Sequence, residues 1–282
     1  MTIAATLRDA AAHLAATSDT PRLDAELLMA HLLGTTRTEM LLRRMGDAAP
    51  SDFAGLIERR LSHMPVAYIL GRQEFWGLDF GIAPGVLIPR SDSETVVRAA
   101  LAAKPDARRV LDLGTGSGAL LLAVLSELPL AHGIGIDASP AAGTVAAANA
   151  SNLGFAGRAQ IVGCDWSRAD QMAQLGRFDL ILANPPYVED DADLARQVRD
   201  YEPHEALFAG SDGLDAYRLL LPQLPTLLEP GGVAVFEIGA TQAGAVTALA
   251  EAAGFSATLH RDLGDRPRAL ELRRVGELAR KK

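Results

Sequence analysis

The chain has 282 residues, which is enough for one large domain or two ordinary ones and for a core that needs no disulfide or structural metal. It carries 27 Lys and Arg against 35 Asp and Glu, and the net charge of −8 disfavours non-specific binding to nucleic acid or to an anionic membrane. The single cysteine, Cys164, excludes an internal disulfide and a metal site built from several thiolates. Neither a signal-peptide layout nor an apolar stretch of membrane-spanning length is visible, and we expect a cytoplasmic protein that binds no metal.

Residues 1–64 predict a small helical domain. Apolar residues recur there three and four positions apart, as in Leu7, Ala11 and Leu14, which is the spacing of one helix face. Thr20-Pro21 predicts a helix start, because proline at the first helical position loses no hydrogen bond. Basic and acidic residues nearly balance in this region, so it is not a basic arm for nucleic acid.

Residues 65–84 predict a β-hairpin that connects two domains. Aromatic and β-branched residues in Tyr68–Gly71 and Phe75–Phe80 favour two short strands over a helix. The glycines between them fit turns.

Residues 85–282 predict an α/β domain, because strands and helices alternate as in a parallel sheet with helices on both faces. The expected strands are Arg109–Leu113, Ala131–Ile136, Gln160–Val162, Phe178–Leu182, Val233–Glu237, Ala257–Leu259 and Ala269–Leu272. The expected helices are Ser93–Ala103, Ala119–Glu127, Ala141–Asn152, Leu214–Leu228 and Gln242–Ala253.

Only the segment from Asp262 to Arg268 separates the last two strands. That is too short for a helical crossover, so these strands should pair antiparallel. A seven-stranded, mostly parallel sheet with an antiparallel last strand resembles the Rossmann-like fold of class I S-adenosylmethionine methyltransferases.

A glycine-rich turn follows the first of these strands. Gly114-Thr115-Gly116-Ser117-Gly118 joins the strand to a helix start, where glycines allow a tight turn and the helix N-terminus offers free N–H groups. Such a turn predicts a nucleotide-type cofactor site. Because Gly114, Gly116 and Ala119 also satisfy the loose dinucleotide fingerprint, a nicotinamide cofactor remains an alternative at this point.

Acidic and aromatic residues follow the next two strands. Asp137 ends the second strand, where a carboxylate can accept both hydroxyls of an adenosine ribose, or can cap the next helix. After the third strand, the Asp165 carboxylate can accept an adenine amino proton and the Trp166 indole can stack on the ring. The alternatives are a surface turn for Asp165 and a core position for Trp166, and we expect Cys164 to be a small buried residue. The order of these features favours an adenosine-type ligand, because open α/β sheets bind ligands at the carboxyl ends of their strands.

The most informative motif, Asn184-Pro185-Pro186-Tyr187, directly follows the fourth strand. Two prolines fix the backbone and remove two donors, which leaves a rigid segment rich in acceptors. The Asn184 side-chain oxygen and the Pro185 carbonyl can accept the two protons of one planar NH₂ group, and Tyr187 supplies a ring face. An amide nitrogen is a poor nucleophile because its lone pair is delocalised, and these two hydrogen bonds would enrich and orient that lone pair. A methyl group already activated on a sulfonium then needs mainly positioning.

With these residues assembled, the chain resembles the bacterial protein-glutamine N5-methyltransferases of peptide chain release factors, the PrmC/HemK family, over essentially its full length. The segments that carry the resemblance are Leu23–Leu28, Pro65–Gly71, Phe75–Gly77, Val86–Arg90, Asn184–Tyr187, Tyr201–Pro203, Ala206-Leu207 and Asp212–Asp215.

The resemblance implies a site and a substrate. It implies that S-adenosylmethionine binds to Gly114, Thr115, Gly116, Ser117, Gly118, Asp137, Asp165, Trp166 and Asn184. It also implies that Asn184, Pro185, Pro186 and Tyr187 hold the glutamine of the Gly-Gly-Gln motif of release factors for methylation, which tunes translation termination. Residues 1–64 would then dock the release factor, residues 65–84 would connect, and residues 85–282 would form the methyltransferase domain.

One segment departs from the family pattern. The family usually continues Pro-Arg-Pro-Glu/Asp-Thr-Glu, whereas Ser91-Asp92-Ser93-Glu94 follows Pro89-Arg90 here. Ser91 with Glu94 predicts a capping box for the next helix. Any role of Arg90 and Glu94 in the site stays open.

Other functions remain as alternatives. A DNA methyltransferase acting on the amino group of adenine N6 or cytosine N4 would face the same chemical problem. It must flip a base and bind phosphates, and the negative net charge of the chain disfavours phosphate binding. The same charge disfavours an RNA or ribosomal-protein substrate. A nicotinamide-dependent oxidoreductase would use the segment from Gly114 to Ala119, but the histidines show no hydride-transfer motif. An intact Asn184–Tyr187 motif disfavours a non-catalytic adaptor. We expect a monomer that binds release factors, with neither nucleic acid nor a membrane as a direct partner.

Overall fold

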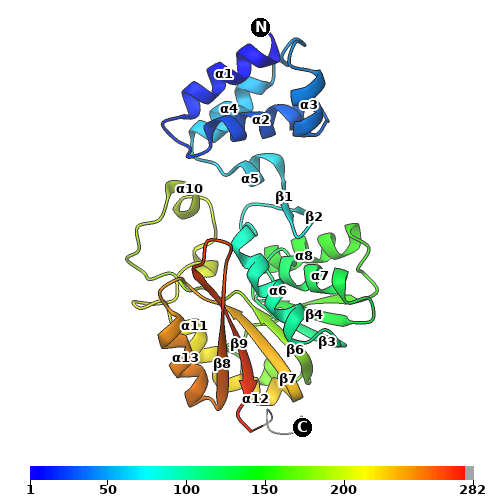
Figure 1. Cartoon of the computed structure of the whole chain (residues 1–282), viewed down its shortest axis with the longest axis vertical. Helices are drawn as coiled ribbons and strands as arrows, with labels where there is room; N and C mark the ends of the chain where they lie inside the picture. The colour runs from blue at the N-terminus through cyan, green and yellow to red at the C-terminus, as the bar shows by residue number, and fades with distance from the viewer. Residues whose placement is uncertain (277–282) are drawn as a thin grey trace. The chain divides into compact units, whose positions relative to one another are not determined.

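The computed structural model describes residues 1–276, so residues 277–282 of the predicted domain 85–282 lie outside the described residues. The chain forms two compact units (Figure 1). The first contains Met1–Gln73, Ile82–Pro84 and Leu194–Tyr201, and the second contains Glu74–Gly81, Gly85–Asp193 and the residues from Glu202 onward. The predicted domain boundaries at residues 64 and 84 remain predictions.

The first unit is helical. Thr2 caps its first helix by accepting a hydrogen bond from the Ala5 N–H, and Pro21 lies in the first turn of the second helix, as expected. Its helices are α1 (Ile3–Leu14), α2 (Pro21–Leu32), α3 (Arg37–Arg43), α4 (Phe53–Leu61) and α5 (Val66–Leu70). Their apolar faces meet in one core, whose fully buried members include Ile3, Leu7, Leu14, Leu28, Met29 and Met40.

A buried ion pair lies within this helical unit. Arg60 Nε donates to Asp24 Oδ2 at 2.7 Å, and the two residues are only 3% and 5% exposed. The hydroxyls of Ser18 and Thr20 also donate to the Asp24 carboxylate, at 2.7 and 2.9 Å. Asp24, in the segment Leu23–Leu28, is therefore held by three donors inside the unit.

The predicted hairpin forms over fewer residues than expected. Strands β1 (Arg72–Phe75) and β2 (Leu78–Gly81) make a two-stranded sheet around Trp76-Gly77, where φ is 54° and 71°. Tyr68–Leu70, predicted as a strand, lies in helix α5, so that prediction is wrong. The helix ends because Gly71 adopts the left-handed conformation, with φ of 70°.

The second unit is built on a seven-stranded sheet with the strand order β5-β4-β3-β6-β7-β9-β8 (Figure 1). Its strands are β3 (Arg109–Leu113), β4 (His132–Asp137), β5 (Ala159–Gly163), β6 (Phe178–Ala183), β7 (Leu228–Glu237), β8 (Phe255–Arg261) and β9 (Pro267–Arg274). Strand β3 pairs parallel with β4 and β6, whereas β9 pairs antiparallel with both β7 and β8. The predicted fold, a mostly parallel sheet with an antiparallel last strand, is confirmed.

Helices cover both faces of this sheet. The helices of the second unit are α6 (Glu94–Ala103), α7 (Ala119–Glu127), α8 (Pro140–Asn152), α9 (Ala169–Met172), α11 (Asp215–Leu220), α12 (Leu224–Leu227) and α13 (Ala243–Ala252), with the 3₁₀ turns η1 (Ser91–Ser93), η2 (His204–Ala206) and η3 (Leu221–Gln223). Helix α10 (Arg196–Arg199) belongs to the first unit. On one face, sheet residues such as Ile181 and Phe236 share a core with Tyr217, Leu224 and Val246 from α11, α12 and α13. Helices α6 and α7 pack against the other face (Figure 1). Within residues 1–276, no helix is both long and apolar enough to cross a membrane.

The helical stretch predicted for Leu214–Leu228 is confirmed from Asp215 to Leu227, but it is not one continuous α-helix. The segment is divided into α11, η3 and α12, and Leu228 already belongs to β7. Pro222 and Pro225 each remove a backbone donor and clash with the preceding turn, so one continuous α-helix cannot form.

Candidate functional site

The carboxyl ends of the parallel strands surround one cavity. In the register of the sheet, Leu113 at the end of β3 pairs with Ile136 in β4 and with Ala183 in β6, so the loops after these strands leave the same edge. The cavity has a volume of about 570 Å³, within the range of small-ligand sites. The predicted site residues that line it are Gly114, Thr115, Gly116, Ser117, Asp137, Trp166, Asn184 and Pro186. The predicted residues that do not line it are Gly118, Asp165, Pro185 and Tyr187.

The glycine turn after β3 is held by its neighbours. Gly114 and Gly116 both have positive φ, 71° and 56°, which disfavours any residue with a side chain. A Cβ on Gly114 would come within 2.7 Å of Cζ3 of Trp166, so the indole lies directly against this turn. A Cβ on Gly116 would meet no atom within 4 Å, so the backbone is uncovered there. Gly118, with φ of 85°, is the N-cap of α7.

Asp137 fixes the shape of the same turn. Its Oδ2 accepts a hydrogen bond from the Gly116 N–H at 2.9 Å, and its Oδ1 accepts one from the Ser139 N–H at 2.9 Å. The N-cap of α8 is Ser139, whose hydroxyl accepts from the Ala142 N–H, so Asp137 is not the capping residue. Each carboxylate oxygen has two lone pairs and retains acceptor capacity toward the cavity.

Asp112, inside β3, is a cavity residue that sequence reasoning did not single out. It is 1% exposed, and its Oδ2 accepts a hydrogen bond from the Thr115 hydroxyl at 2.7 Å. Its Oδ1 is buried and has no hydrogen-bond partner. Burial raises the pKa of this carboxyl from 3.8 to about 7, against the opposing effect of the Thr115 hydrogen bond. An unpaired buried carboxylate oxygen on a cavity wall is suited to a cationic donor from a ligand. The available signal was an acidic residue inside an otherwise apolar strand.

The three residues that follow β5, Cys164, Asp165 and Trp166, lie in different environments. Asp165 is half-buried outside the cavity lining, and its Oδ1 accepts a hydrogen bond from the Ser167 N–H at 2.8 Å. This hydrogen bonding to Ser167 lowers the pKa of the Asp165 carboxyl. Trp166 lines the cavity and also packs against the sheet core. Cys164 is buried, as expected.

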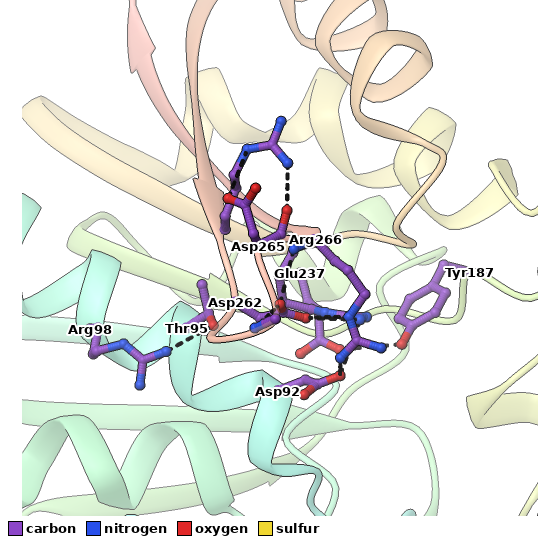
Figure 2. Close-up of polar contacts among 11 residues, drawn as sticks. Asp92, Thr95, Arg98, Tyr187, Glu237, Asp262, Asp265 and Arg266 are labelled. Atoms are coloured by element: carbon purple, nitrogen blue, oxygen red, sulfur yellow. Dashed lines mark hydrogen bonds and ion pairs between the residues drawn. The ribbon is translucent and has the colours of Figure 1, made fainter.

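The Asn-Pro-Pro-Tyr segment divides between cavity and interior. Asn184 lines the cavity, and its Nδ2 lies 3.5 Å from the hydroxyl of Ser93. Tyr187 does not line the cavity, and its hydroxyl donates to Glu237 Oε1 at 3.3 Å (Figure 2). The Tyr187 carbonyl accepts a hydrogen bond from Gln242 Nε2 at 3.0 Å. Tyr187 therefore ties the segment to the end of β7.

The segment before α6 differs from its prediction. The N-cap of α6 is Ser93 and no side chain caps it, so the predicted Ser91–Glu94 capping box is wrong. Residues Ser91–Ser93 form a 3₁₀ turn instead, which leaves Ser91 a full turn away from the helix start. The Glu94 carboxylate instead accepts from the Trp76 N–H at 3.4 Å and lies 3.7 Å from the Arg98 guanidinium.

Arg90 pairs with the carboxylate of Glu202, which is 4% exposed. The other oxygen of Glu202 accepts a hydrogen bond from the Ile88 N–H at 3.2 Å. Glu202 therefore holds Ile88 and Arg90, which flank Pro89 in the cavity wall.

Comparisons of the family models and of curated relatives with this chain point to the same family. Residues 5–71 match the PrmC N-terminal domain, and residues 104–254 match a methyltransferase domain. A release factor glutamine methyltransferase from Bradyrhizobium diazoefficiens is 40% identical over 286 residues, which cover 97% of this chain and 93% of that protein. Another from Cereibacter sphaeroides is 43% identical over 281 residues, which cover 97% and 99%. A third from Rhodospirillum rubrum is 42% identical over 261 residues, which cover 90% and 79%.

Proposed function

Because this chain belongs to the release factor glutamine methyltransferase family, we propose that it methylates the side-chain amide nitrogen (N5) of the glutamine in the Gly-Gly-Gln motif of peptide chain release factors, with S-adenosylmethionine as methyl donor. The observation that carries the proposal is the position of Asn184. Its amide lies in the wall of the same cavity as the glycine turn after β3, where a methyl donor and a planar amide can meet.

The residues around the cavity fit S-adenosylmethionine. Gly116 leaves backbone uncovered for close approach, and Asp112 presents a buried carboxylate oxygen without a partner, which suits the ammonium group of the cofactor. Asp137 has acceptor capacity left for ribose hydroxyls, and Trp166 offers a ring for the adenine. When bound, the cofactor supplies a methyl group on a positively charged sulfur.

Asp165 lies outside the cavity lining, but it follows directly after β5 and precedes Trp166. It is the proposed acceptor for the adenine amino group. Gly114, Thr115, Ser117 and Gly118 complete the proposed cofactor-binding turn.

The chain's own residues would act on the glutamine amide by accepting hydrogen bonds from its two N–H groups. The Asn184 side-chain oxygen and the Pro185 carbonyl are the proposed acceptors, and the two prolines keep them fixed. Hydrogen bonds from both N–H groups draw electron density toward the nitrogen and hold its lone pair in the direction of attack. No base is required before transfer, because the product loses its proton afterwards. Tyr187 contributes by anchoring the segment through its hydroxyl and carbonyl.

The helical first unit is the proposed docking domain for the release factor body. Its support is the match of residues 5–71 to the PrmC N-terminal domain, together with a surface that is not basic. A cytoplasmic location is part of the same proposal, because release factors act where translation takes place.

A direct test compares substrates in one experiment. Purified chain and S-adenosylmethionine carrying a labelled methyl group are incubated with a release factor, with the same release factor in which the Gly-Gly-Gln glutamine is replaced by alanine, and with double-stranded DNA. We expect label only on the unmodified release factor. Label on DNA, or equal label on the alanine variant, would contradict the proposal.

A further inference from the structure

Glu237, at the carboxyl end of β7, is a buried acid that the proposed reaction does not use. It is 1% exposed and lies at the junction of three segments. The Tyr187 hydroxyl donates to its Oε1 at 3.3 Å, and the nearby Ser93 side chain lowers the pKa of the carboxyl. Its Oε2 is buried and has no hydrogen-bond partner.

Ser93 stands between this acid and the reaction motif. It is 3% exposed, and on its other side Asn184 Nδ2 lies 3.5 Å from its Oγ, at the long end of hydrogen-bond distance. Ser93, Glu237 and Asn184 therefore form a chain of polar contacts that ends at the cavity.

We propose that Glu237 and Ser93 are positioning residues that fix which way the Asn184 amide faces. An ionised carboxylate can only accept, so the single proton of the Ser93 hydroxyl is directed to Glu237. The lone pairs of that hydroxyl then remain for a donor, and the donor end of Asn184 is its NH₂ group. The amide nitrogen is held toward Ser93, and the amide oxygen is left toward the cavity. The inference rests on the proposed role of Asn184 as an acceptor for the glutamine amide.

The orientation matters because an amide has one donor end and one acceptor end of almost equal shape. With the oxygen in the cavity, Asn184 accepts a hydrogen bond from the glutamine NH₂ group. With the amide turned over, an NH₂ group would face the NH₂ group of the substrate, and two donors repel. Nothing in the packing of Asn184 by shape alone would select the productive state, since the two ends differ little in size.

The charged neighbours of Glu237 are already committed to each other. Arg268 of β9 lies 3.1 Å from the Asp92 carboxylate and 3.5 Å from the Asp262 carboxylate, and its buried Nε has no hydrogen-bond partner. Asp92 and Asp262 also contact Arg266 in the turn between β8 and β9 (Figure 2). Two acids thus share Arg268, and Glu237 has no direct ion pair among the described residues.

The remaining groups that face Glu237 are phenols. Tyr187 faces it from the loop after β6, and Tyr217 of α11 donates to its backbone carbonyl at 2.9 Å. Burial raises the pKa of both hydroxyls, so they stay protonated and act as donors. Burial also raises the pKa of Glu237 from 4.5 to about 7, although Ser93, Arg268 and Tyr187 favour its ionised form. Asp92 adds a small repulsion in the same direction as burial.

Protonation of Glu237 would remove the directional control. A protonated carboxyl can donate to Ser93, and the Ser93 hydroxyl is then free to donate to the oxygen of Asn184. The amide would lose its preference, so the rate constant for methyl transfer should fall as the pH drops below about 7. Binding of S-adenosylmethionine should not follow this titration, because none of these hydrogen bonds reaches the glycine turn.

The test uses the full chain with S-adenosylmethionine and a release factor. We expect Ser93→Ala to lower kcat by about 10- to 100-fold, the usual cost of losing a residue that orients a reacting group, with the KM for S-adenosylmethionine unchanged. Ser93→Thr keeps the hydroxyl and should recover most of kcat. Glu237→Gln keeps the shape but cannot titrate, so the acid limb of the kcat profile near pH 7 should disappear. Ser126→Ala, which removes a serine hydroxyl bonded only to the Ala123 carbonyl in α7, is the matched control and should behave as the unmodified chain.

The outcomes separate the two proposals. If the unmodified chain labels the release factor and Ser93→Ala keeps its kcat, or Glu237→Gln keeps the acid limb, the positioning role is wrong and the proposed function stands. If Ser93→Ala and Ser93→Thr lose activity equally, the hydroxyl is not what matters and the positioning role is again wrong. If the unmodified chain does not label the release factor at all, the proposed function fails, and the role of Ser93 and Glu237 fails with it.

Discussion

The indole of Trp166 lies so close to Gly114 that a Cβ on that glycine would come within 2.7 Å of Cζ3 of the ring. The two residues come from loops after different strands, β5 and β3, which lie on either side of β4 in the sheet. Two separate features therefore require glycine at position 114. Its φ of 71° disfavours any residue with a side chain, and the Trp166 ring leaves no space for a Cβ. The contact joins the glycine turn to the proposed adenine platform.

Gly114→Ala should therefore weaken cofactor binding. The added methyl group must displace Trp166 or distort the turn, and we expect the Kd for S-adenosylmethionine to rise by about 10-fold or more, measured by titration calorimetry. Gly244→Ala, at an exposed position of α13 where a Cβ meets no atom within 4 Å, is the matched control and should leave Kd unchanged. Equal affinity of the two variants would show that the contact between Gly114 and Trp166 does not shape the site.

Replacement of Asp112 by asparagine should change how stability depends on pH. The pKa of this carboxyl is raised by burial from 3.8 to about 7, so the folded state binds its proton more tightly than the unfolded state does. The resulting stabilisation is complete below the unfolded pKa and is lost as the pH rises through about 7. Between about pH 5 and pH 8, Asp112→Asn should reduce the fall in the free energy of unfolding by roughly 2 kcal/mol, measured by urea titration. An identical fall in both proteins would mean that Asp112 is not a buried titrating group.

Asn184→Ala should abolish most methyl transfer without loss of the cofactor. The variant lacks one of the two proposed acceptors for the glutamine amide, and we expect a loss of about 2 kcal/mol or more of transition-state stabilisation in kcat. The affinity for S-adenosylmethionine, measured by calorimetry, should fall much less than kcat, because the other proposed cofactor-binding residues remain. Asn152→Ala, at an exposed position near the end of α8, is the control. Activity in Asn184→Ala equal to that of the control would remove Asn184 from the reaction.

Arg60→Ala should destabilise the helical unit. The substitution leaves Asp24 as a buried carboxylate without its cation, and breaking a buried pair costs about 3 kcal/mol or more. Arg59→Ala, at the neighbouring exposed position, should cost about 0.5 kcal/mol or less. Circular dichroism during chemical unfolding compares the two. Similar losses in both variants would show that the Asp24–Arg60 pair contributes nothing beyond an ordinary surface arginine.

The strands of the sheet and the position of the cavity were predictable because they depend on local patterns. Apolar runs mark the strands, and parallel strands place their following loops at one edge, which brings Gly114–Ser117, Asp137 and Asn184 to one cavity. The short segment between the last two strands was enough to predict their antiparallel pairing. Two departures from the predicted elements are local. Residues 68–70, predicted as a strand, lie in helix α5, which ends at Gly71. Pro222 and Pro225 divide the helical stretch after Leu214 into shorter helices.

The support of the site was not predictable in the same way. The contact between Ser93 and Asn184 joins residues 91 positions apart, and Tyr187 meets Glu237 across 50 positions. Such pairs depend on how α6, β6 and β7 are packed, and no local spacing encodes them. The one available signal was an acidic residue within an apolar strand, present both in β3 at Asp112 and at the end of β7 at Glu237.

Peptide mass spectrometry can show whether this chain methylates a release factor on one glutamine. A release factor incubated with the chain and S-adenosylmethionine is digested, and the Gly-Gly-Gln peptide is fragmented to locate any added methyl group. We expect one methyl group on the side-chain nitrogen of that glutamine, and far less of it in the same time when Asn184→Ala replaces the unmodified chain. An unmodified Gly-Gly-Gln peptide, or a methyl group placed on another residue, would contradict the proposed function.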